Sequence, residues 1–336
     1  MKFSTTVFAF LGLLSSVRAD EAAFRALEKQ SNLLQLQALN ASQTGCTSAN
    51  VAVRREWSTL PTKEKHSYIN AVKCLRRLPP LNLPSLVPGV RSRFDDYQAV
   101  HINSTFIIHF NGRFLPWHRY FVSVYEQALR SQCNYTGYQP YWEWSTFAND
   151  PVASPLFDGS NTSISGNGAK VPHDDFSYTI PYSGGLHNTC PAQDGGGCLT
   201  TGPFANLTVN LGPVNSNASL PGWVGSGTGL DYNPRCLTRD MGSYWSNYTG
   251  WDNVTTLLEA DDFATFATLL TQGVHRGGHF TIGGLNNDLF TSPGDPAFFF
   301  HHAQIDRIWT LWQNLNLTKR GTEIAGTSTW FNCMHS

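Results

Sequence analysis

Apolar residues recur at helical spacing through the first quarter of the chain. Between residues 21 and 78 they fall mostly three or four positions apart, an interval that places side chains on one face of a helix. The pattern covers residues 24 to 39 and, after a break, resumes from 57 to 75. We therefore predict helices in both stretches and assign them a scaffolding role.

Residues 145 to 250 follow no such pattern. This zone is rich in Gly, Pro, Asn and Ser, which is typical of long surface loops with a few short strands. Loops of this length are uncommon in a compact domain unless they have a function, so we expect them to wrap the core or border a binding site. His173 and His187 lie here without spaced partners, and we expect both to face solvent.

The first of two histidine-rich segments places three histidines within 18 residues. His109 and His118 are nine positions apart and would point to opposite faces of one continuous helix. Gly112 and Pro116 lie between them and predict a helix break. We expect His109 to end one helix, His118 to begin the next, and His101 to reach in from a preceding loop.

Aromatic residues surround these three histidines. A single histidine is usually an ordinary structural residue, but three together in apolar surroundings favour a buried metal site. The flanking rings are Phe106, Phe110, Phe114 and Trp117.

The second segment begins with His275 and His279, whose spacing aligns two imidazoles on one helical face. Zinc proteases use the same spacing with a glutamate directly after the first histidine. Arg276 occupies that position here, so the protease chemistry would lack its general base. We therefore set the zinc protease interpretation aside.

Further along, Phe298, His302, Asp306 and Trp309 fall at spacings of four, four and three, which places them on one side of a predicted helix. His302 thereby gains an aromatic ring one turn before it and a carboxylate one turn after it. Such a carboxylate commonly orients a metal-binding histidine. His301 points about 100° away and lacks that support, so we prefer His302 as a ligand.

Together the two segments supply six histidines in two sets of three, with no carboxylate or thiolate clearly in either set. Neutral nitrogen ligands in this grouping suit two copper ions better than zinc, iron or magnesium. A haem would need one or two axial ligands rather than six grouped histidines. The six predicted ligands are His101, His109, His118, His275, His279 and His302.

On these residues the chain resembles the type-3 copper proteins of the tyrosinase and catechol oxidase family, especially the short secreted fungal members. The resemblance covers most of residues 90 to 315. It rests on His101, His109, Leu-Pro-Trp-His118-Arg, His275-x-x-x-His279 and Asp-Pro-x-Phe-x-x-His-His302-x-x-x-Asp306-Arg-x-Trp. It implies a mainly α fold, with a central four-helix bundle that holds the dicopper site among long loops and few short strands. It also implies that Phe298 restrains a histidine and that substrate enters over the second copper.

Three departures from the family pattern bear on activity. Many members carry a cysteine that forms a thioether to the second ligand of the first copper, but no cysteine lies close to His109. Larger relatives have a C-terminal domain over the site, whereas this chain has 34 residues after His302, so we expect an open site. Monophenol hydroxylases of the family often have an asparagine directly after the first ligand of the second copper, with a nearby glutamate that holds a water. Here Arg276 stands at the asparagine position, and Gln272 is the nearest residue that could replace the glutamate.

We therefore predict an oxidase that uses dioxygen to convert o-diphenols, and also o-aminophenols, to quinones, with weak or absent monophenol hydroxylation. Arg276, Phe280 and Leu289 are candidates for the wall of the substrate pocket. A true tyrosinase remains an alternative from the same class, and a haemocyanin-like oxygen-binding protein is the alternative from another class. A zinc hydrolase is a third interpretation.

The first 19 residues have the features of an export signal. Lys2 provides a positive charge, residues 7 to 14 form an apolar run, and Val17 and Ala19 place small residues before a cleavage site. The run is too short to span a bilayer, and no later stretch is long enough. We predict a signal peptide over 1–19, a single dicopper catalytic domain over 20–336 without a lid domain, and an extracellular location.

Sequons and cysteines agree with export. Seven scattered cysteines without a Cys-x-x-Cys pair favour disulfides over a zinc ribbon. We expect three disulfides and one free thiol, with Cys190–Cys198 as the one specific pair.

Nine Asn-x-Ser/Thr sequons predict N-linked glycans: Asn40, Asn103, Asn134, Asn161, Asn206, Asn217, Asn247, Asn253 and Asn316. We expect Asn103, between two predicted ligands, to lie too close to the core for a glycan.

Composition and charge narrow the class of partner. Charged residues make up 14% of the chain and aromatic residues 13%, a balance that favours a compact globule over disorder. The formal net charge of -1 provides no basic field to attract nucleic acid or acidic membranes. The expected partners are therefore small: a phenol and dioxygen.

Overall fold

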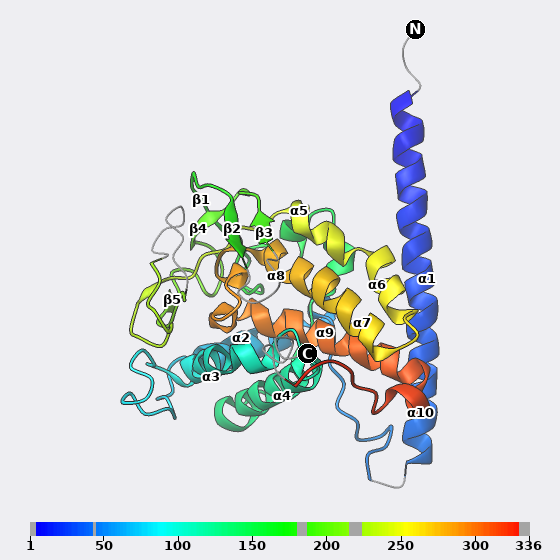
Figure 1. Ribbon diagram of the computed structural model, residues 1–336, viewed down its shortest axis with the longest axis horizontal. Coiled ribbons are helices and arrows are strands. Elements are labelled where there is room, and N and C mark those ends of the chain that lie inside the picture. Colours follow the sequence, from blue (N-terminus) through cyan, green and yellow to red (C-terminus); the bar gives the residue numbers. More distant parts are fainter. Residues whose placement is uncertain (1–4, 43–44, 180–186, 215–223, 329–336) are drawn as a thin grey trace.

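The computed structural model describes residues 5–42, 45–179, 187–214 and 224–328 and confirms the mainly α fold (Figure 1). The helices are α1 (Thr5–Ala41), α2 (Thr62–Leu75), α3 (Arg93–Ile108), α4 (Phe114–Cys133), α5 (Ser243–Ser246), α6 (Trp251–Leu258), α7 (Phe263–Leu270), α8 (Arg276–Ile282), α9 (Ala297–Leu315) and α10 (Leu317–Arg320). A π-helical turn, Thr271–His275, joins α7 to α8.

Helix α9 passes through the middle of the molecule, with α3 and α4 on one side and α7 and α8 on the other (Figure 1). Phe298, Phe299 and Phe300, three consecutive residues that point in different directions from α9, are all fully buried. A helix that is apolar all round belongs in a core. The six predicted ligands are spread over these helices. In the first set, His101 lies on α3, His109 directly follows α3 and His118 lies on α4. In the second set, His275 ends the π-turn, His279 lies on α8 and His302 lies on α9.

Helix α3 begins earlier than the sequence pattern indicated. The side chain of Ser92 accepts the Asp95 backbone N–H, and the Asp95 carboxylate accepts the Ser92 N–H, which together form a capping box. With this start, His101 lies in the middle of the helix. The expectation that His101 reaches in from a loop is therefore wrong, because Ser-x-x-Asp is a helix-start signal that the apolar pattern does not show.

The predicted break between His109 and His118 is present. Helix α3 ends at Ile108 and α4 begins at Phe114, with Pro116 in the first turn of α4, where its missing N–H costs nothing. Phe110 occupies the left-handed region with φ of 54°. This turn lets two histidines nine residues apart face a common point.

The N-terminal scaffold also has the predicted form. Helix α1 packs along α6 and α9, and Phe24 is fully buried with its ring 5.0 Å from that of Trp251. The first part of α1 extends beyond the rest of the molecule (Figure 1). Helix α2 packs on α4, and a Cys74–Cys133 disulfide links their C-terminal ends. Within the described ranges, none of the helices combines the length and apolar character needed to cross a membrane.

The loop-rich zone forms three antiparallel two-stranded sheets, in which β1 pairs with β4, β2 with β3, and β5 with β6. The strands are β1 (Gly168–Lys170), β2 (Phe176–Thr179), β3 (His187–Cys190), β4 (Gly196–Leu199), β5 (Thr208–Val209) and β6 (Arg235–Cys236). The sequence predicted this combination of long loops with a few short strands.

The cysteine pairing differs from the prediction. Cys198 forms its disulfide with Cys236 rather than with Cys190. Closeness in sequence is misleading here, because Cys190 ends a separate hairpin and is buried with Trp245 as a free thiol. Cys46 is a second free cysteine, exposed, so two disulfides lie within the described residues. Cys333 lies outside them.

His173 is also placed differently from the prediction. Its side chain is only 4% exposed, and its Nε2 lies 2.9 Å from the Asp240 carboxylate. Its Nδ1 lies 2.8 Å from the Val171 carbonyl oxygen. A histidine without a partner at helical spacing is therefore not necessarily exposed, because loop residues such as Asp240 can bind it from elsewhere in the fold. The His187 side chain lies outside the described part of the chain.

Candidate dicopper site

The first histidine cluster is oriented by the backbone. The Nδ1 atoms of His101, His109 and His118 each lie within hydrogen-bond distance of a carbonyl oxygen. Because a carbonyl oxygen only accepts, each Nδ1 carries the proton and donates it, and each Nε2 keeps a free lone pair. The acceptors are the carbonyl oxygens of Phe290, Thr105 and Phe114, at 2.8, 3.0 and 2.8 Å respectively.

These lone pairs converge within the first cluster. One potential ligand atom from each of its three histidines lies within 4.8 Å of the others. His101 Nε2 and His118 Nε2 are buried and have no hydrogen-bond partner. A buried polar nitrogen without a partner is costly unless something else binds it. The donor set therefore fits a metal ion that prefers neutral nitrogen ligands.

The second cluster contains four histidines rather than three. His275, His279, His301 and His302 have potential ligand atoms within 4.8 Å of one another. Nε2 of His302 faces Nε2 of His279 at 3.1 Å, and Nε2 of His275 is buried without a partner. In contrast, Nε2 of His301 lies 2.9 Å from the His275 carbonyl oxygen and donates to it. This geometry favours His302 over His301, as expected, although the ligand set itself stays a prediction.

Phe298 packs directly on His302. The two rings are stacked with centroids 4.1 Å apart, and Phe298 is fully buried. His302 also stacks on His118 of the first cluster, with ring centroids 4.5 Å apart. Phe298 therefore restricts the rotation of His302, and the two clusters adjoin through a pair of stacked imidazoles.

Burial keeps all of these histidines neutral. The cost of placing an imidazolium in an apolar interior lowers the pKa of every histidine in both clusters, to about 4 for His109 and about 3 for His301. Neighbouring imidazoles add to the effect for His118 and His302. Neutral imidazole is the form that binds a metal, so the clusters are prepared to hold one at neutral pH.

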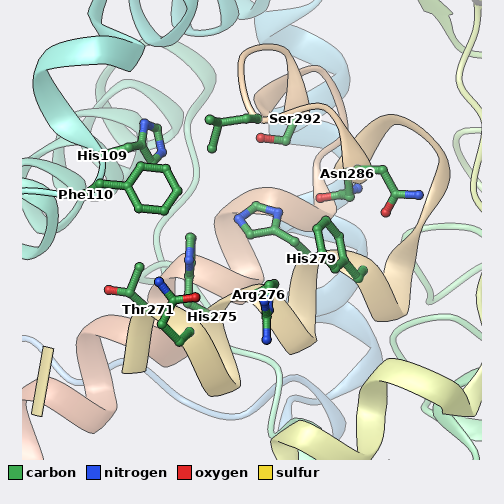
Figure 2. A pocket seen from close by; sticks show the side chains of 12 residues that line it. His109, Phe110, Thr271, His275, Arg276, His279, Asn286 and Ser292 are labelled. Atoms are coloured by element: carbon green, nitrogen blue, oxygen red, sulfur yellow. The ribbon is translucent and has the colours of Figure 1, made fainter. Parts of the chain in front are cut away.

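A pocket leads from solvent to both clusters (Figure 2). It encloses about 560 Å³ of non-protein space, part of it continuous with solvent. His109 of the first cluster and His275 and His279 of the second lie in its wall. The other lining residues are Phe110, Thr271, Gln272, Arg276, Phe280, Asn286, Asn287, Leu289 and Ser292.

The three predicted pocket residues, Arg276, Phe280 and Leu289, all lie in this wall. Sequence analysis named Phe110 only as a ring near the histidines and Gln272 only as a substitute for a glutamate, and it did not identify the remaining polar lining residues, Asn286 among them. For Phe110, the adjacent His109 was a usable signal. Asn286 and its neighbours follow a pair of glycines after α8, and nothing in their local pattern indicates that this turn folds back over the histidine clusters.

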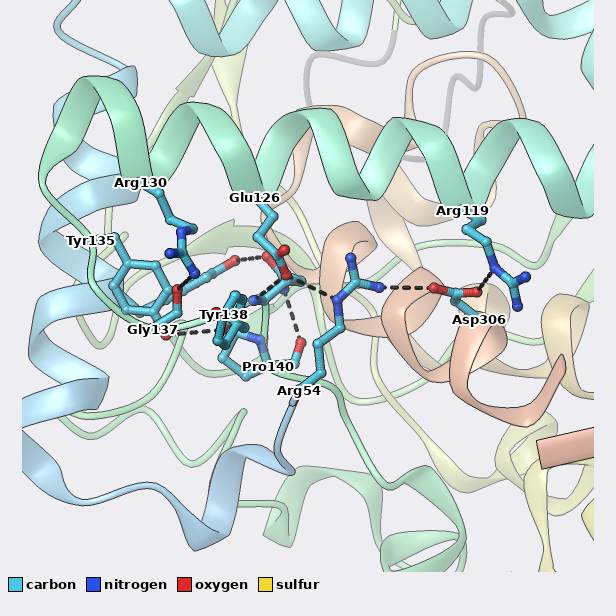
Figure 3. Close-up of polar contacts among 11 residues, drawn as sticks. Arg54, Arg119, Glu126, Arg130, Tyr135, Gly137, Tyr138, Pro140 and Asp306 are labelled. Atoms are coloured by element: carbon cyan, nitrogen blue, oxygen red, sulfur yellow. Dashed lines mark hydrogen bonds and ion pairs between the residues drawn. The ribbon is translucent and has the colours of Figure 1, made fainter. Parts of the chain in front are cut away.

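Asp306 has different partners from those expected (Figure 3). One carboxylate oxygen accepts a hydrogen bond from Arg54 at 2.9 Å, and the other accepts one from Arg119. Arg54 also donates to Glu126 on α4 at 2.9 Å. Both oxygens are thus taken by arginines, so the expectation that Asp306 orients a ligating histidine is wrong. Its structural effect is to tie α9 to α4 and to the segment before α2.

Two adjoining clusters of neutral, buried histidines on a helical bundle could each hold a metal ion. The family model described as the common central domain of tyrosinase matches residues 91–315. The chain therefore belongs to the tyrosinase family, whose members are type-3 dicopper proteins, and it is an oxidoreductase.

Two fungal relatives and one solved structure cover most of the chain. The tyrosinase-like protein orsC of Emericella nidulans is 48% identical over 301 residues, covering 87% of this chain and 82% of that protein. Tyrosinase P of Aspergillus terreus is 41% identical over 293 residues, covering 83% and 80% respectively. A mutant polyphenol oxidase from Thermothelomyces thermophila superposes with a TM-score of 0.86 at 42% identity, covering 94% of this chain and 88% of that one.

Proposed function

We propose that the protein is a secreted oxidase that binds one copper with His101, His109 and His118 and a second with His275, His279 and His302. Its substrates are o-diphenols and o-aminophenols, and monophenol hydroxylation is weak or absent. The observation that carries this proposal is the solvent-accessible pocket whose wall includes histidines of both clusters. An oxygen carrier needs no such access for an organic molecule, whereas an oxidase of phenols does.

Two coppers at this site would supply two-electron redox chemistry with dioxygen. In the overall reaction, two o-diphenols and one dioxygen give two o-quinones and two waters. The protein contributes the geometry. Backbone carbonyls fix the three imidazoles of the first cluster, Phe298 stacks on His302, and Phe110, Phe280 and Leu289 give the pocket apolar walls.

The polar lining residues favour a diphenol over a monophenol as substrate. Hydroxylation of a monophenol requires a phenol with a pKa of about 10 to give up its proton, a step that a nearby general base accelerates. The lining contains Gln272 and Arg276 but, within the described part of the chain, neither an aspartate nor a glutamate. An amide and a guanidinium are not effective bases at neutral pH, so the deprotonation has no assistance from these side chains.

Secretion and glycosylation are part of the same proposal. The export features of residues 1–19 support cleavage after Ala19, which would leave residues 20–336 as one catalytic domain. Of the eight sequons in the described ranges, seven have an exposed asparagine. Asn103 is among them, on the outer face of α3, so the expectation that it lies too close to the core is wrong. Exposure at these positions supports N-linked glycans on the mature protein.

Oxygen uptake by the mature, copper-loaded protein tests the proposal. We would compare an o-diphenol, its matched monophenol and an o-aminophenol, with the His302→Ala variant as the inactive control. We expect uptake with the diphenol and the aminophenol. Rapid uptake with the monophenol after a lag would instead identify a true tyrosinase. No uptake with any of the three, despite two bound coppers, would favour an oxygen-binding protein.

A further inference from the structure

A short C-terminal segment, residues 324–327, crosses the turn between α3 and α4, and we call it the strap. Beyond α10 the chain runs back towards α4 (Figure 1), and the Gly112 N–H donates to the Thr327 carbonyl oxygen at 2.9 Å. Gly112 is buried although it lies in a turn between two helices. The strap lies outside residues 91–315, the segment that matches the common central domain.

Two glycines allow the strap to approach the turn this closely. A methyl group at Gly112 would lie 2.8 Å from the Ala325 carbonyl oxygen, and a methyl group at Gly326 would lie 2.9 Å from the Gly112 nitrogen. Both distances are shorter than side-chain carbons adopt. Gly326 also has φ of 109°, a region open to glycine but unfavourable for residues with a side chain. The two backbones therefore meet directly, and a methyl group on either one would push the strap away.

Contacts on the far side of the bundle anchor the start of the strap. Arg320 donates to the carbonyl oxygens of Trp312 and Ala260, at 3.1 and 2.8 Å. The Glu323 carboxylate accepts the Phe263 N–H at 3.2 Å. The strap therefore links the α3–α4 turn to the C-terminal part of α9 and to the start of α7.

The turn under the strap has a conformation that needs support. Phe110 occupies the left-handed region, which a residue with a side chain keeps only where its surroundings hold it there. One restraint comes from Asn111, whose amide donates to the His109 carbonyl and whose side-chain oxygen accepts the Arg113 N–H, both at 2.8 Å. The strap supplies a second restraint at Gly112. His109 and Phe110 both line the pocket, so this turn determines where a predicted ligand and a wall residue lie.

Resting on the proposed function, we propose that the strap is a positioning element for the first copper site. It holds the α3–α4 turn in the conformation that directs His109 towards the first cluster and Phe110 towards the pocket. Gly112 and Gly326 are positioning residues, since neither belongs to the described pocket lining or to a histidine cluster. When the strap is displaced, Phe110 relaxes and His109 spends less time in place to bind copper.

The copper affinity of the first cluster is the direct test. We would measure it by competition with a chelator in the His302→Ala background, in which the first cluster keeps all of its histidines. There Gly112→Ala should lower the affinity by about 10- to 100-fold, the usual effect of losing an outer support. In the His118→Ala background, where the second cluster is complete, the same change should have no effect. Unchanged affinity in the first background, or an equal loss in both, would overturn the proposal.

A second variant breaks the same contact from the other side. Gly326→Ala should reproduce the loss, and the double variant should lose little more than either single one, because both changes remove one interaction. Gly227→Ala is the matched control. Gly227 is exposed and also has a positive φ, of 65°, but a methyl group there meets no atom within 4 Å. It should keep the wild-type affinity, and additive losses in the double variant would contradict the proposal.

Amide hydrogen exchange provides a readout that depends on neither copper nor turnover. In the copper-free full-length protein, the amides of residues 109–113 should exchange faster in Gly112→Ala and Gly326→Ala than in the wild type, while those of α9 should be unchanged. Unchanged exchange at residues 109–113 would count against the strap.

Oxidation of catechol separates the two levels of failure. If the wild type oxidises catechol and the strap variants bind copper as tightly as the wild type, this inference fails alone. If the wild type binds two coppers and oxidises no diphenol, the proposed function fails, and the copper affinities still decide whether the strap positions His109.

Discussion

At the scale of single residues, the site depends on which nitrogen of each histidine is free. A carbonyl oxygen fixes the Nδ1 proton in three histidines and leaves Nε2 for a metal, but in His301 it is Nε2 that donates to the His275 carbonyl. His301 and His302 are thus adjacent, equally buried and chemically identical, yet they have different partners. They differ because their side chains leave α9 in different directions.

Copper content distinguishes these two neighbours. His302→Ala should lower the bound metal by about one ion per chain, since three ligands define each site. His301→Gln should retain both coppers, because glutamine can still donate to the His275 carbonyl, with at most a modest loss of thermal stability. Elemental analysis of the purified variants measures this directly. Equal copper loss in both variants would show that His301 is itself a ligand.

Asp288 is a residue that positions a ligand from a distance. Its buried carboxylate accepts the backbone N–H groups of Phe290, Thr291 and Val214, at 2.8, 3.2 and 3.2 Å. These bonds hold the loop whose Phe290 carbonyl orients His101. Asp288→Ala should therefore weaken copper binding by about 10- to 100-fold, the usual effect of removing an outer-shell support.

Competition with a copper chelator measures the affinity of the Asp288 variants. Asp288→Asn, which keeps one acceptor oxygen, should retain more affinity than Asp288→Ala. If Asp288→Ala bound copper as tightly as the wild type, the loop would hold its shape without this carboxylate.

At the scale of elements, helix starts and breaks bring the histidines together. The capping box at Ser92 and Asp95 sets the start of α3, and the turn between α3 and α4 redirects the chain between His109 and His118. The π-turn before α8 ends at His275, where an extra residue per turn shifts the face on which that ligand lies.

The cap contributes to stability rather than to chemistry. Ser92→Ala should lower the free energy of unfolding by about 1 kcal/mol, the usual value for a lost N-cap. Activity per bound copper should remain unchanged, because Ser92 touches no ligand. Ser104→Ala, a half-buried position inside the same helix without a cap role, should cost nothing or stabilise slightly. Urea unfolding of the copper-free proteins compares them, and equal effects would rule out a capping contribution.

At the scale of the whole molecule, one buried ion pair joins the loops to the bundle. Arg239 forms a two-pronged contact with Asp295, just before α9, and both side chains are fully buried. The same guanidinium donates to the carbonyls of Ile164, Ser165 and Gly166. The loop-rich zone is therefore attached at the start of the helix that carries His302.

Loss of this arginine should be among the most damaging single changes. Arg239→Met leaves the Asp295 charge and three carbonyl oxygens buried with fewer partners, so we expect a loss of about 3–5 kcal/mol in unfolding free energy. Arg77→Gln, at an exposed position, is the matched control and should change stability by less than about 0.5 kcal/mol. Denaturant unfolding measures both, and a loss near that of the control would mean that the loops are held by other contacts.

The sequence by itself determined the features that depend on local spacing and local chemistry. The helical scaffold, the break between His109 and His118 and the pairing of Phe298 with His302 could all be predicted. Each depends on residues a few positions apart, whose relative directions follow from the geometry of one helix or turn.

Only the tertiary structure decided the contacts between distant segments. Asp306 shares a face with His302, but arginines 187 and 252 residues away bind it instead. Cys198 forms a disulfide with Cys236, and Asp240 binds His173. Both contacts are made by loop-rich segments whose sequences have no periodic pattern. A side chain takes the best partner within reach in space, and spacing along the sequence restricts that choice only within a single helix or turn.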